Sequence, residues 1–361
     1  MPTRPITPKN CVEVSKYFVR DKVYFLSDVV VGGLVRFLEV FTKRLPNPGE
    51  TLLSKPFEEH LGGKGASAAV AAYRLSHKKP KGREAAVKAD SHTDEIRVQF
   101  VGAVGADGYG PRLLKKLEEN GVETHKVRTV KEASSGRAVV IVEDRFRENR
   151  VLYDPGANHM IHPGDLKTLE DLTGGSVPAL LVTQLELRRD TIEQVIETAN
   201  RAHVDVLLNP APALSVLPNI LPMITHLVMN RSEAQTLSAN EPLDENDPNR
   251  WSPVAEYFLS QQVQNVVITL SRQGAYYAND SDKDFVEAEK DYMLVDTTGA
   301  GDTFIGAYAV EYVRQKQLGQ WDIKAAVAYG CKASARTVEQ TGCLDPIPWS
   351  DAWTDETNEE M

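Results

Sequence analysis

The chain carries Asp296-Thr297-Thr298-Gly299-Ala300-Gly301-Asp302-Thr303-Phe304 between an apolar stretch and an alanine-rich helical pattern. The small residues 299–301 allow a tight turn, so that unpaired N–H groups at the start of the following helix can point at phosphate oxygens. Such a turn is as often structural as functional. Asp302 favours the functional interpretation of this turn. A carboxylate among phosphate-binding amides would repel the ligand unless it accepted a proton from an attacking hydroxyl. The stretch therefore predicts an anion cradle with a catalytic carboxylate inside it.

Length and composition are compatible with an enzyme that acts on a small molecule, without proving one. The chain has 361 residues, 42% of them hydrophobic, and we expect one large core with a small appendage. No apolar run reaches the roughly 18 residues of a membrane span, and a net charge of -10 disfavours nucleic acid as a partner. The N-terminus lacks a secretory pattern, and Cys11, Cys331 and Cys343 are too widely spaced for a disulfide framework or a zinc motif. We therefore expect a cytosolic protein, with the nucleus as an open alternative.

Short apolar runs alternate with amphipathic runs from about Val29 onward. This alternation predicts a doubly wound α/β fold, in which a mainly parallel sheet is flanked by helices. The predicted strands are Val29–Val31, Val98–Val101, Ala179–Thr183, Val204–Leu208, His226–Met229 and Val266–Leu270. The predicted helices are Lys64–Leu75, Gly110–Asn120, Thr191–Ala202, Ser232–Leu237 and Pro253–Gln262.

Two regions interrupt this alternation, residues 36–62 and 136–158. They contain runs typical of strands outside the main sheet, and we expect a small β lid over a site at the carboxyl edge of the main strands. Exposed lid strands favour a homodimer formed through the lid. The main domain is predicted to span residues 29–350. We expect residues 1–28, which are polar and proline-containing, to form a poorly ordered extension, and residues 351–361 to form a similar acidic tail.

A second glycine-rich turn, Gly62-Gly63-Lys64-Gly65-Ala66-Ser67, precedes a helix of small residues. Taken alone, this pattern is more typical of a tight loop before a close-packed helix than of a binding site. Paired with the downstream turn, it predicts the second wall of a pocket.

Polar residues follow three of the predicted strands. Asn230 and Glu233 have the spacing of a helix capping box, but they also suit contacts with a nucleotide phosphate and with hydrated Mg²⁺. Glu186 is either an acceptor for sugar hydroxyls or a surface residue at a strand end. The run 269–274 either floors a nucleotide pocket or begins a hairpin. The residues alone leave each pair of alternatives open.

Together these motifs resemble the ribokinase (PfkB-type) family of sugar kinases over residues 29–349. Two signatures are specific, Gly62–Ala66 with its alanine-rich helix and Asp296–Phe304. Connecting runs that point towards the ribokinase branch are Leu45–Thr51, Gly156–Asn158, Gln184–Glu186 and Asn209–Ala213. The resemblance implies a ribokinase-like fold with a β lid. It also implies Mg²⁺-dependent transfer of the ATP γ-phosphate to the primary hydroxyl of a sugar, with D-ribose giving D-ribose 5-phosphate.

The same resemblance implies roles for individual residues. Asp302 would be the catalytic base, and the amides of Gly299, Ala300 and Gly301 would form the anion hole. Sugar contacts would come from Gly63, Lys64, Gly65, Ala66, Ser67, Glu186 and Asp302. ATP contacts would come from Asn230, Thr269, Leu270, Ser271, Arg272, Gln273, Gly274, Gly301 and Asp302, and Glu233 would hold Mg²⁺ through water. A monovalent cation, typically K⁺, would lie beside the anion hole, near Asp296, Thr298, Thr337, Gln340 and Gly342.

One departure from the family concerns the sugar. After the first strand the family carries Asn-x-Asp, whose Asp holds sugar hydroxyls, whereas the aligned residues here are Val35-Arg36-Phe37, and Ser67 stands in place of an Asn. Each lost partner should weaken polyol binding by about 1–3 kcal/mol. Three hypotheses follow: a ribose kinase, a kinase for a nucleoside or another alcohol that stacks on Phe37, and a nucleotide- or sugar-binding homologue with impaired turnover.

Overall fold

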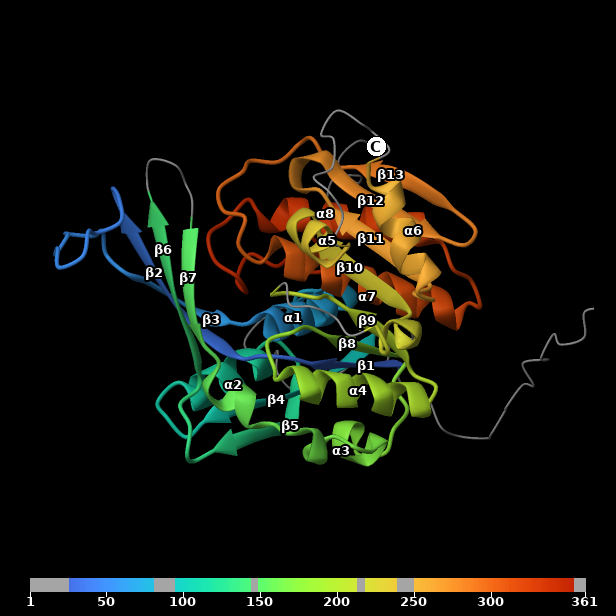
Figure 1. Ribbon diagram of the computed structural model, residues 1–361, viewed down its shortest axis with the longest axis horizontal. Helices are drawn as coiled ribbons and strands as arrows, with labels where there is room; N and C mark the ends of the chain where they lie inside the picture. The colour runs from blue at the N-terminus through green and yellow to red at the C-terminus, as the bar shows by residue number, and fades with distance from the viewer. Residues whose placement is uncertain (1–25, 81–94, 144–148, 213–217, 239–249, 354–361) are drawn as a thin grey trace, which may run out of the picture.

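The computed structural model describes residues 26–80, 95–143, 149–212, 218–238 and 250–353. Its largest element is a nine-stranded sheet with the order β13-β12-β11-β10-β9-β8-β1-β4-β5 (Figure 1). Neighbouring strands from β5 to β11 are parallel, while β12 and β13 each pair antiparallel. The strands are β1 (Leu26–Val31), β4 (Ile96–Gly105), β5 (Glu123–Val130), β8 (Leu180–Thr183), β9 (Asp205–Leu208), β10 (His226–Asn230), β11 (Asn265–Thr269), β12 (Gly274–Asn279) and β13 (Lys283–Glu287).

Helices cover both faces of this sheet, which confirms the predicted doubly wound architecture (Figure 1). Val30 belongs to the core shared with α1, α2, α7 and α8, whereas its neighbours Val29 and Val31 belong to the core shared with α3, α4, α5 and α6. Burial on both faces explains the three consecutive valines, Val29–Val31, in the second half of β1. The helices are α1 (Lys64–Ser76), α2 (Gly110–Glu118), α3 (Leu169–Thr173), α4 (Arg189–Arg201), α5 (Arg231–Ser238), α6 (Ser252–Ser260), α7 (Ala300–Gln317) and α8 (Ile323–Thr337).

A second, four-stranded sheet has the order β3-β2-β6-β7 and rises from the main body at the left of Figure 1. Its strands are β2 (Val35–Thr42), β3 (Glu58–Gly62), β6 (Gly136–Glu143) and β7 (Asn149–Asp154). We call it the small sheet. It confirms the strands predicted outside the main sheet, although the polar connection at 144–148 lies outside the described residues. Because β2 begins four residues after β1 ends and β3 leads directly into α1, the small sheet is anchored at the carboxyl end of β1.

The described fold extends beyond the predicted span of 29–350 at both ends. β1 begins at Leu26, and Asp28 is fully buried within it, so the last residues of the predicted extension belong to the sheet. At the other end, the Trp353 ring packs edge-on against Tyr329, with ring centroids 5.6 Å apart, and the Lys332 ammonium lies 5.2 Å from its centroid. The first residues of the predicted tail therefore dock on α8. Residues 1–25 and 354–361 lie outside the described residues.

Within the described parts of the chain, no helix combines the length and the apolar character that crossing a lipid bilayer requires.

Candidate active site

Two glycine-rich turns meet because the helices that follow them pack closely. Gly63 precedes α1 with φ of 113°, and Gly299 precedes α7 with φ of 76°, values that favour glycine. A β-carbon on Gly306 of α7 would lie only 2.4 Å from Cβ of Ala71 in α1. Since no side chain separates the helix axes there, the start of α1 and the start of α7 face the same region.

Asp302 lies in the first turn of α7, where it is partly exposed. Burial of its carboxyl raises its pKa to about 7; Glu186 and Glu233 act in the same direction, and the Lys64 ammonium opposes them. A carboxyl that titrates near neutral pH is suited to accept a proton from a substrate and to release it again.

Lys64 is the first residue of α1, and its ammonium lies among carboxylates from three different parts of the chain. Asp302 raises the pKa of Lys64 most, and Glu186 and Glu233 raise it further against the effect of burial. One cation facing three carboxylates leaves this centre negative when all are ionised. The electrostatics therefore favour the approach of a further cation.

Glu186 lies just after β8 and is almost fully buried, which excludes the alternative of a surface residue at a strand end. Its Oε2 accepts a hydrogen bond from the Gly65 amide at 3.4 Å. Burial raises the pKa of Glu186, while Lys64 and the amides of Gly65 and Gly33 lower it. The carboxylate is thus held against the N-terminal end of α1, beside the first glycine-rich turn.

Asn230 and Glu233 form a capping arrangement at the start of α5. Glu233 accepts hydrogen bonds from the Asn230 amide at 2.8 Å and from its side-chain Nδ2 at 2.9 Å, and the Glu233 amide donates to Asn230 Oδ1 at 2.9 Å. The structural alternative for this pair is therefore confirmed. Glu233 is also buried and shifts the pKa of both Lys64 and Asp302, so the cap places its carboxylate at the charged centre.

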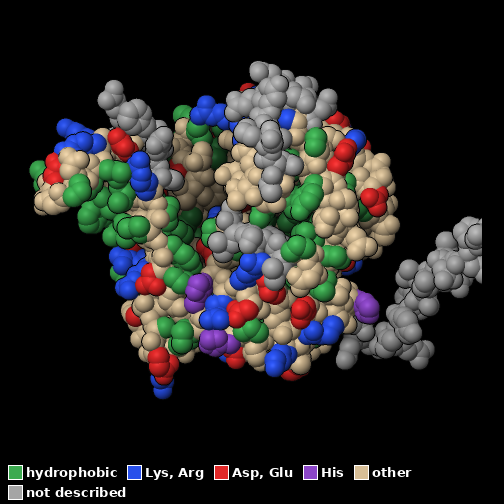
Figure 2. Space-filling view, viewed as in Figure 1, with side chains coloured by type: hydrophobic (Ala, Val, Ile, Leu, Met, Phe, Trp, Pro, Cys, Tyr) green, Lys and Arg blue, Asp and Glu red, His purple; other side chains and the backbone are tan. Residues whose placement is uncertain are grey.

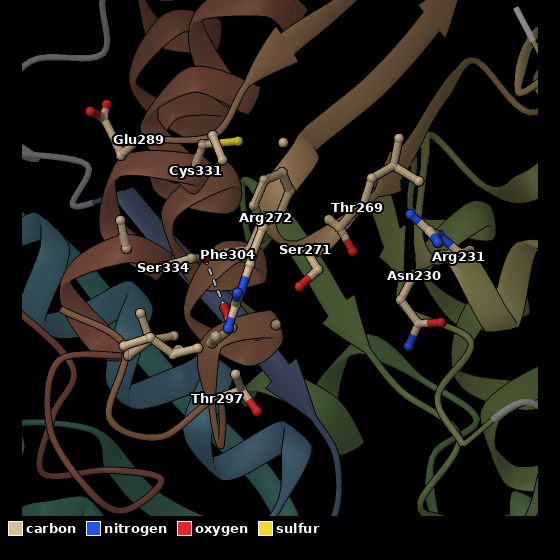
Figure 3. Close-up of a pocket in the computed structure, with 18 of the residues that line it drawn as sticks. Asn230, Arg231, Thr269, Ser271, Arg272, Glu289, Thr297, Phe304, Cys331 and Ser334 are labelled. Carbon is tan, nitrogen blue, oxygen red and sulfur yellow. Dashed lines mark hydrogen bonds between the residues drawn. The ribbon is translucent and has the colours of Figure 1, made fainter. Parts of the chain in front are cut away.

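A cavity of about 600 Å³ opens beside the start of α7. Most of the predicted ATP contacts line it, namely Asn230, Thr269, Leu270, Ser271, Arg272, Gly274 and Gly301. In Figure 3, Asn230 and Arg231 lie on one side and Phe304, Cys331 and Ser334 on the other, with Arg272 and Ser271 between them. Gln273 is not among the lining residues, and its side-chain oxygen instead accepts a hydrogen bond from Arg231 at 2.7 Å. Asp302 also stands outside the lining, one residue beyond Gly301.

The wall on the α7 and α8 side was missed by sequence reasoning. Phe304 of α7 and Cys331, Ser334 and Ala335 of α8 line the cavity, and Ser334 Oγ donates to the Ala300 carbonyl at 2.8 Å. A β-carbon on Gly330 would lie 2.7 Å from the Phe304 ring, so this packing of α7 on α8 requires glycine at position 330. No local pattern signals it, because it arises from contact between two helices.

The residues predicted to surround a monovalent cation are brought only partly together. Asp296 accepts hydrogen bonds from the Thr298 amide and from the Gly342 amide, each at 2.9 Å, and so joins the loop before α7 to the loop after α8. Thr337 is buried and contacts the Thr303 hydroxyl at 3.1 Å. Gln340 is exposed to solvent.

Phe37 faces the first glycine-rich turn. A β-carbon on Gly62 would lie 3.7 Å from the Phe37 ring, 3.5 Å from Ser67 Oγ and 2.7 Å from Cys343 Sγ, so these three side chains gather around Gly62. The Ser67 hydroxyl is buried and has no hydrogen-bond partner among the described residues. Arg36 is not part of this group, because it pairs with Glu59 at 2.9 Å. An aromatic ring therefore stands next to the turn that the sequence assigns to the acceptor.

Comparisons with known proteins identify the family. Residues 27–350 match the family described as pfkB family carbohydrate kinase. The chain is 34% identical to a ribokinase of Schizosaccharomyces pombe, covering 89% of this chain and 94% of that protein, and 31% identical to a deoxyribokinase of Salmonella typhi, covering 88% and 94%. Its fold matches the structure of Arabidopsis thaliana ribokinase complexed with ribose and ATP, with a TM-score of 0.76 at 24% identity over 91% of this chain and 97% of that one. The chain therefore belongs to the pfkB family of carbohydrate kinases, phosphotransferases that act on an alcohol group.

Proposed function

We propose that this kinase transfers the γ-phosphate of ATP to the primary hydroxyl of D-ribose, giving D-ribose 5-phosphate. The observation that carries the proposal is the position of Asp302, which lies between the large cavity and the first glycine-rich turn. A nucleotide bound in the cavity would present its terminal phosphate at the start of α7. A sugar bound by the first turn would approach from the other side.

In this proposal Asp302 accepts the proton of the attacking hydroxyl, and its pKa of about 7 keeps a large share of it ionised at neutral pH. The amides of Gly299, Ala300 and Gly301 would form the anion hole, because they lie at the start of α7, where helix amides lack partners within the helix. The Ala300 amide, which donates to the Thr297 carbonyl at 3.3 Å, would have to exchange or share that bond. Glu186 and the turn 63–67 contact the sugar. Positioning and fixed dipoles supply most of the rate enhancement.

The donor would be bound by the cavity residues 269–272, with Gly274, Asn230 and Gly301. Gln273 drops out of this proposed set because its side chain is bound to Arg231. The charged centre fits Mg²⁺, since it offers the buried carboxylate of Glu233 and is negative overall. Glu233 would hold the ion through water, and the ion would neutralise the phosphate charge.

A monovalent cation such as K⁺ is proposed for the loops that Asp296 joins. Asp296 would supply the negative charge, and the backbone carbonyls of Thr298 and Gly342, whose amides bond to Asp296, would supply oxygen ligands. Thr337 and Gln340 complete the proposed set. Its role would be to fix the shape of the loop before the anion hole.

A second candidate acceptor is a nucleoside or another alcohol with a flat apolar part. The Phe37 ring beside Gly62 favours it, because an aromatic ring can stack on a base but cannot hold a diol. A coupled ADP-release assay separates the candidates. It would compare ribose, 2-deoxyribose, other sugars and nucleosides, with and without K⁺ and with Mg²⁺ removed by a chelator. A ribose preference supports the first proposal, and a nucleoside preference of several orders of magnitude in kcat/KM supports the second. Binding of ATP without product from any acceptor would contradict both and indicate a homologue with impaired turnover.

A homodimer formed through the small sheet is also proposed. Exposed apolar side chains lie at both edges of the small sheet, with Phe57 just before β3 and Val151 and Leu152 on β7, and Figure 2 shows apolar atoms over this part of the molecule. Light scattering after gel filtration should give a dimer mass. Leu152→Lys should yield a monomer, whereas Leu318→Lys, at an equally exposed leucine beyond α7, should not.

We propose the cytosol as the compartment, and the nuclear alternative gains no support.

A further inference from the structure

Three metal-ligating side chains meet on one face of the small sheet, and none of them is among the residues assigned to catalysis. They are Glu39 on β2 and Glu58 and His60 on β3, and their ligand atoms all lie within 4.8 Å of one another. We propose that this cluster is a binding site for a divalent transition-metal ion of the Zn²⁺ class.

The strand register produces the cluster. Glu39 is directly opposite Glu58 in the antiparallel pair of β2 and β3, and His60 is two residues beyond Glu58. Because side chains alternate between the faces of a strand, all three point to the same face. Two carboxylates directly opposite each other repel and destabilise the pairing unless a cation lies between them.

No lysine or arginine of the described residues supplies that cation. Within the described ranges, the ion pairs of Glu39 and Glu58 are both with the His60 imidazole, at 3.6 Å and 3.7 Å. On the opposite face of the same two strands, Glu59 is matched by Arg36 at 2.9 Å and by Arg112 at 2.7 Å. Among the described residues, Glu59 on one face is therefore neutralised by two arginines. Glu39 and Glu58 on the other face share one imidazole.

The distances suit ligands of a common ion better than hydrogen bonds. At 3.6–3.7 Å, neither carboxylate is within hydrogen-bonding distance of His60 Nε2, and this nitrogen is excluded from solvent with no partner among the described residues. Bonds of about 2.0–2.2 Å around a tetrahedral metal place neighbouring ligand atoms roughly 3.3–3.6 Å apart. The observed separations are close to that range, so small side-chain movements complete the geometry.

The donor set selects the type of ion. One imidazole nitrogen and two carboxylate oxygens suit Zn²⁺, Co²⁺ or Ni²⁺, whereas Mg²⁺ takes oxygen ligands and keeps most of its water. Three protein ligands leave a fourth position for water. His60 Nδ1 lies 3.6 Å from the position of a β-carbon on Gly342, so the ion would bind where the small sheet meets the loop after α8. Occupancy would stabilise that contact.

Zinc titration of the full-length protein tests the proposal. The protein would be prepared without an affinity tag and stripped with a chelator, and ZnCl₂ binding would be followed by calorimetry, with Co²⁺ absorption as a check on tetrahedral ligation. We expect one equivalent to bind to the wild type, with affinity lowered at least tenfold by His60→Gln and by Glu39→Gln. Glu58→Gln should have a smaller effect, because Glu58 is the most exposed ligand.

The matched control is His125→Gln, which removes an exposed imidazole that has a single carboxylate, Glu123, at 3.7 Å. It should leave zinc binding unchanged. Zinc should also raise the Tm of the wild type in a concentration-dependent way, and not that of His60→Gln. Absence of stoichiometric binding to the wild type, or equal losses in His60→Gln and His125→Gln, would overturn the proposal. Circular dichroism of each variant without metal shows whether it has folded.

Discussion

Lys64 and Asp302 hold each other in their charged forms: the ammonium lowers the pKa of the carboxyl, and the carboxylate raises the pKa of the ammonium. The two residues begin different helices, α1 and α7. Burial works against the charge on both, so each residue's protonation state depends on the other being in place.

Asp302→Asn should abolish turnover, by at least about 10³-fold in kcat, because the amide cannot accept the hydroxyl proton. The binding of ATP should change little, since Asp302 does not line the cavity. Steady-state kinetics and calorimetric titration with a non-hydrolysable ATP analogue provide the two measurements. Near-normal turnover in this variant would remove the assignment of Asp302 as the base.

The pH dependence of kcat/KM should show an ascending limb with an apparent pKa of about 7, because Asp302 must be ionised to act. Lys64→Gln removes the ammonium that lowers this pKa, so the limb should move to higher pH. Lys115→Gln, at an exposed lysine of α2, is the control and should leave the profile in place. A profile that does not move in Lys64→Gln would contradict the coupling described above.

Phe37→Asp should lower the KM for ribose several-fold, because it offers a carboxylate to the sugar hydroxyls at the position where the ring now stands. The KM for ATP should stay the same. Arg36→Gln is the neighbouring control, since that side chain pairs with Glu59 instead of facing Gly62. If Phe37→Asp instead destroys activity with every acceptor, the ring serves the fold and not the choice of substrate.

His226 should make the protein labile to acid. Burial lowers its pKa to about 3, so the folded state keeps it neutral while the unfolded state binds a proton below about 6.5. The contribution of neutral His226 to the free energy of unfolding is complete above pH 6.5. It is lost as the pH falls towards 3, with a slope of at most about 1.4 kcal/mol per pH unit. Urea unfolding at pH 7.0 and 5.0 should therefore show a smaller loss in His226→Phe than in the wild type. His125→Gln, at an exposed histidine, should behave like the wild type.

Six of the nine main strands, β1, β4, β8, β9, β10 and β11, and the starts of α1 and α7 could be predicted because their signals are local: apolar runs, glycine-rich turns and small residues in series. The strands β5, β12 and β13 were not predicted. Asp28 shows the limit of this reasoning. A carboxyl group normally marks a solvated segment, yet Asp28 is buried in β1, and burial raises its pKa well above its ordinary value. The neighbouring strands β4 and β8 impose this position, and they lie far away in the sequence.

The same limit applies to the site. The glycine-rich turns, Asp302 and the run 269–274 could be proposed as site residues from the sequence, because loops that bind phosphate need particular backbone freedom. Their roles stay predictions. The wall formed by Phe304, Cys331 and Ser334 was not, since it depends on how α7 packs on α8. Sequence reasoning also treated capping and binding as alternatives for Glu233. In the structure the two go together, because the capping bonds hold the Glu233 carboxylate close enough to affect the pKa of Asp302.

The close contact between α1 and α7 depends on glycine at position 306, which limits how this enzyme can be engineered. A single added methyl group there would lie 2.4 Å from Ala71 Cβ and 2.7 Å from the Ala72 nitrogen. The added group would push α1 and α7 apart, and Lys64 and Asp302 lie in the first turns of these two helices. Library designs that seek new acceptors should leave the contact between Gly306 and Ala71 unchanged, because a substitution there would disturb the proposed donor and acceptor sites together without contacting either substrate.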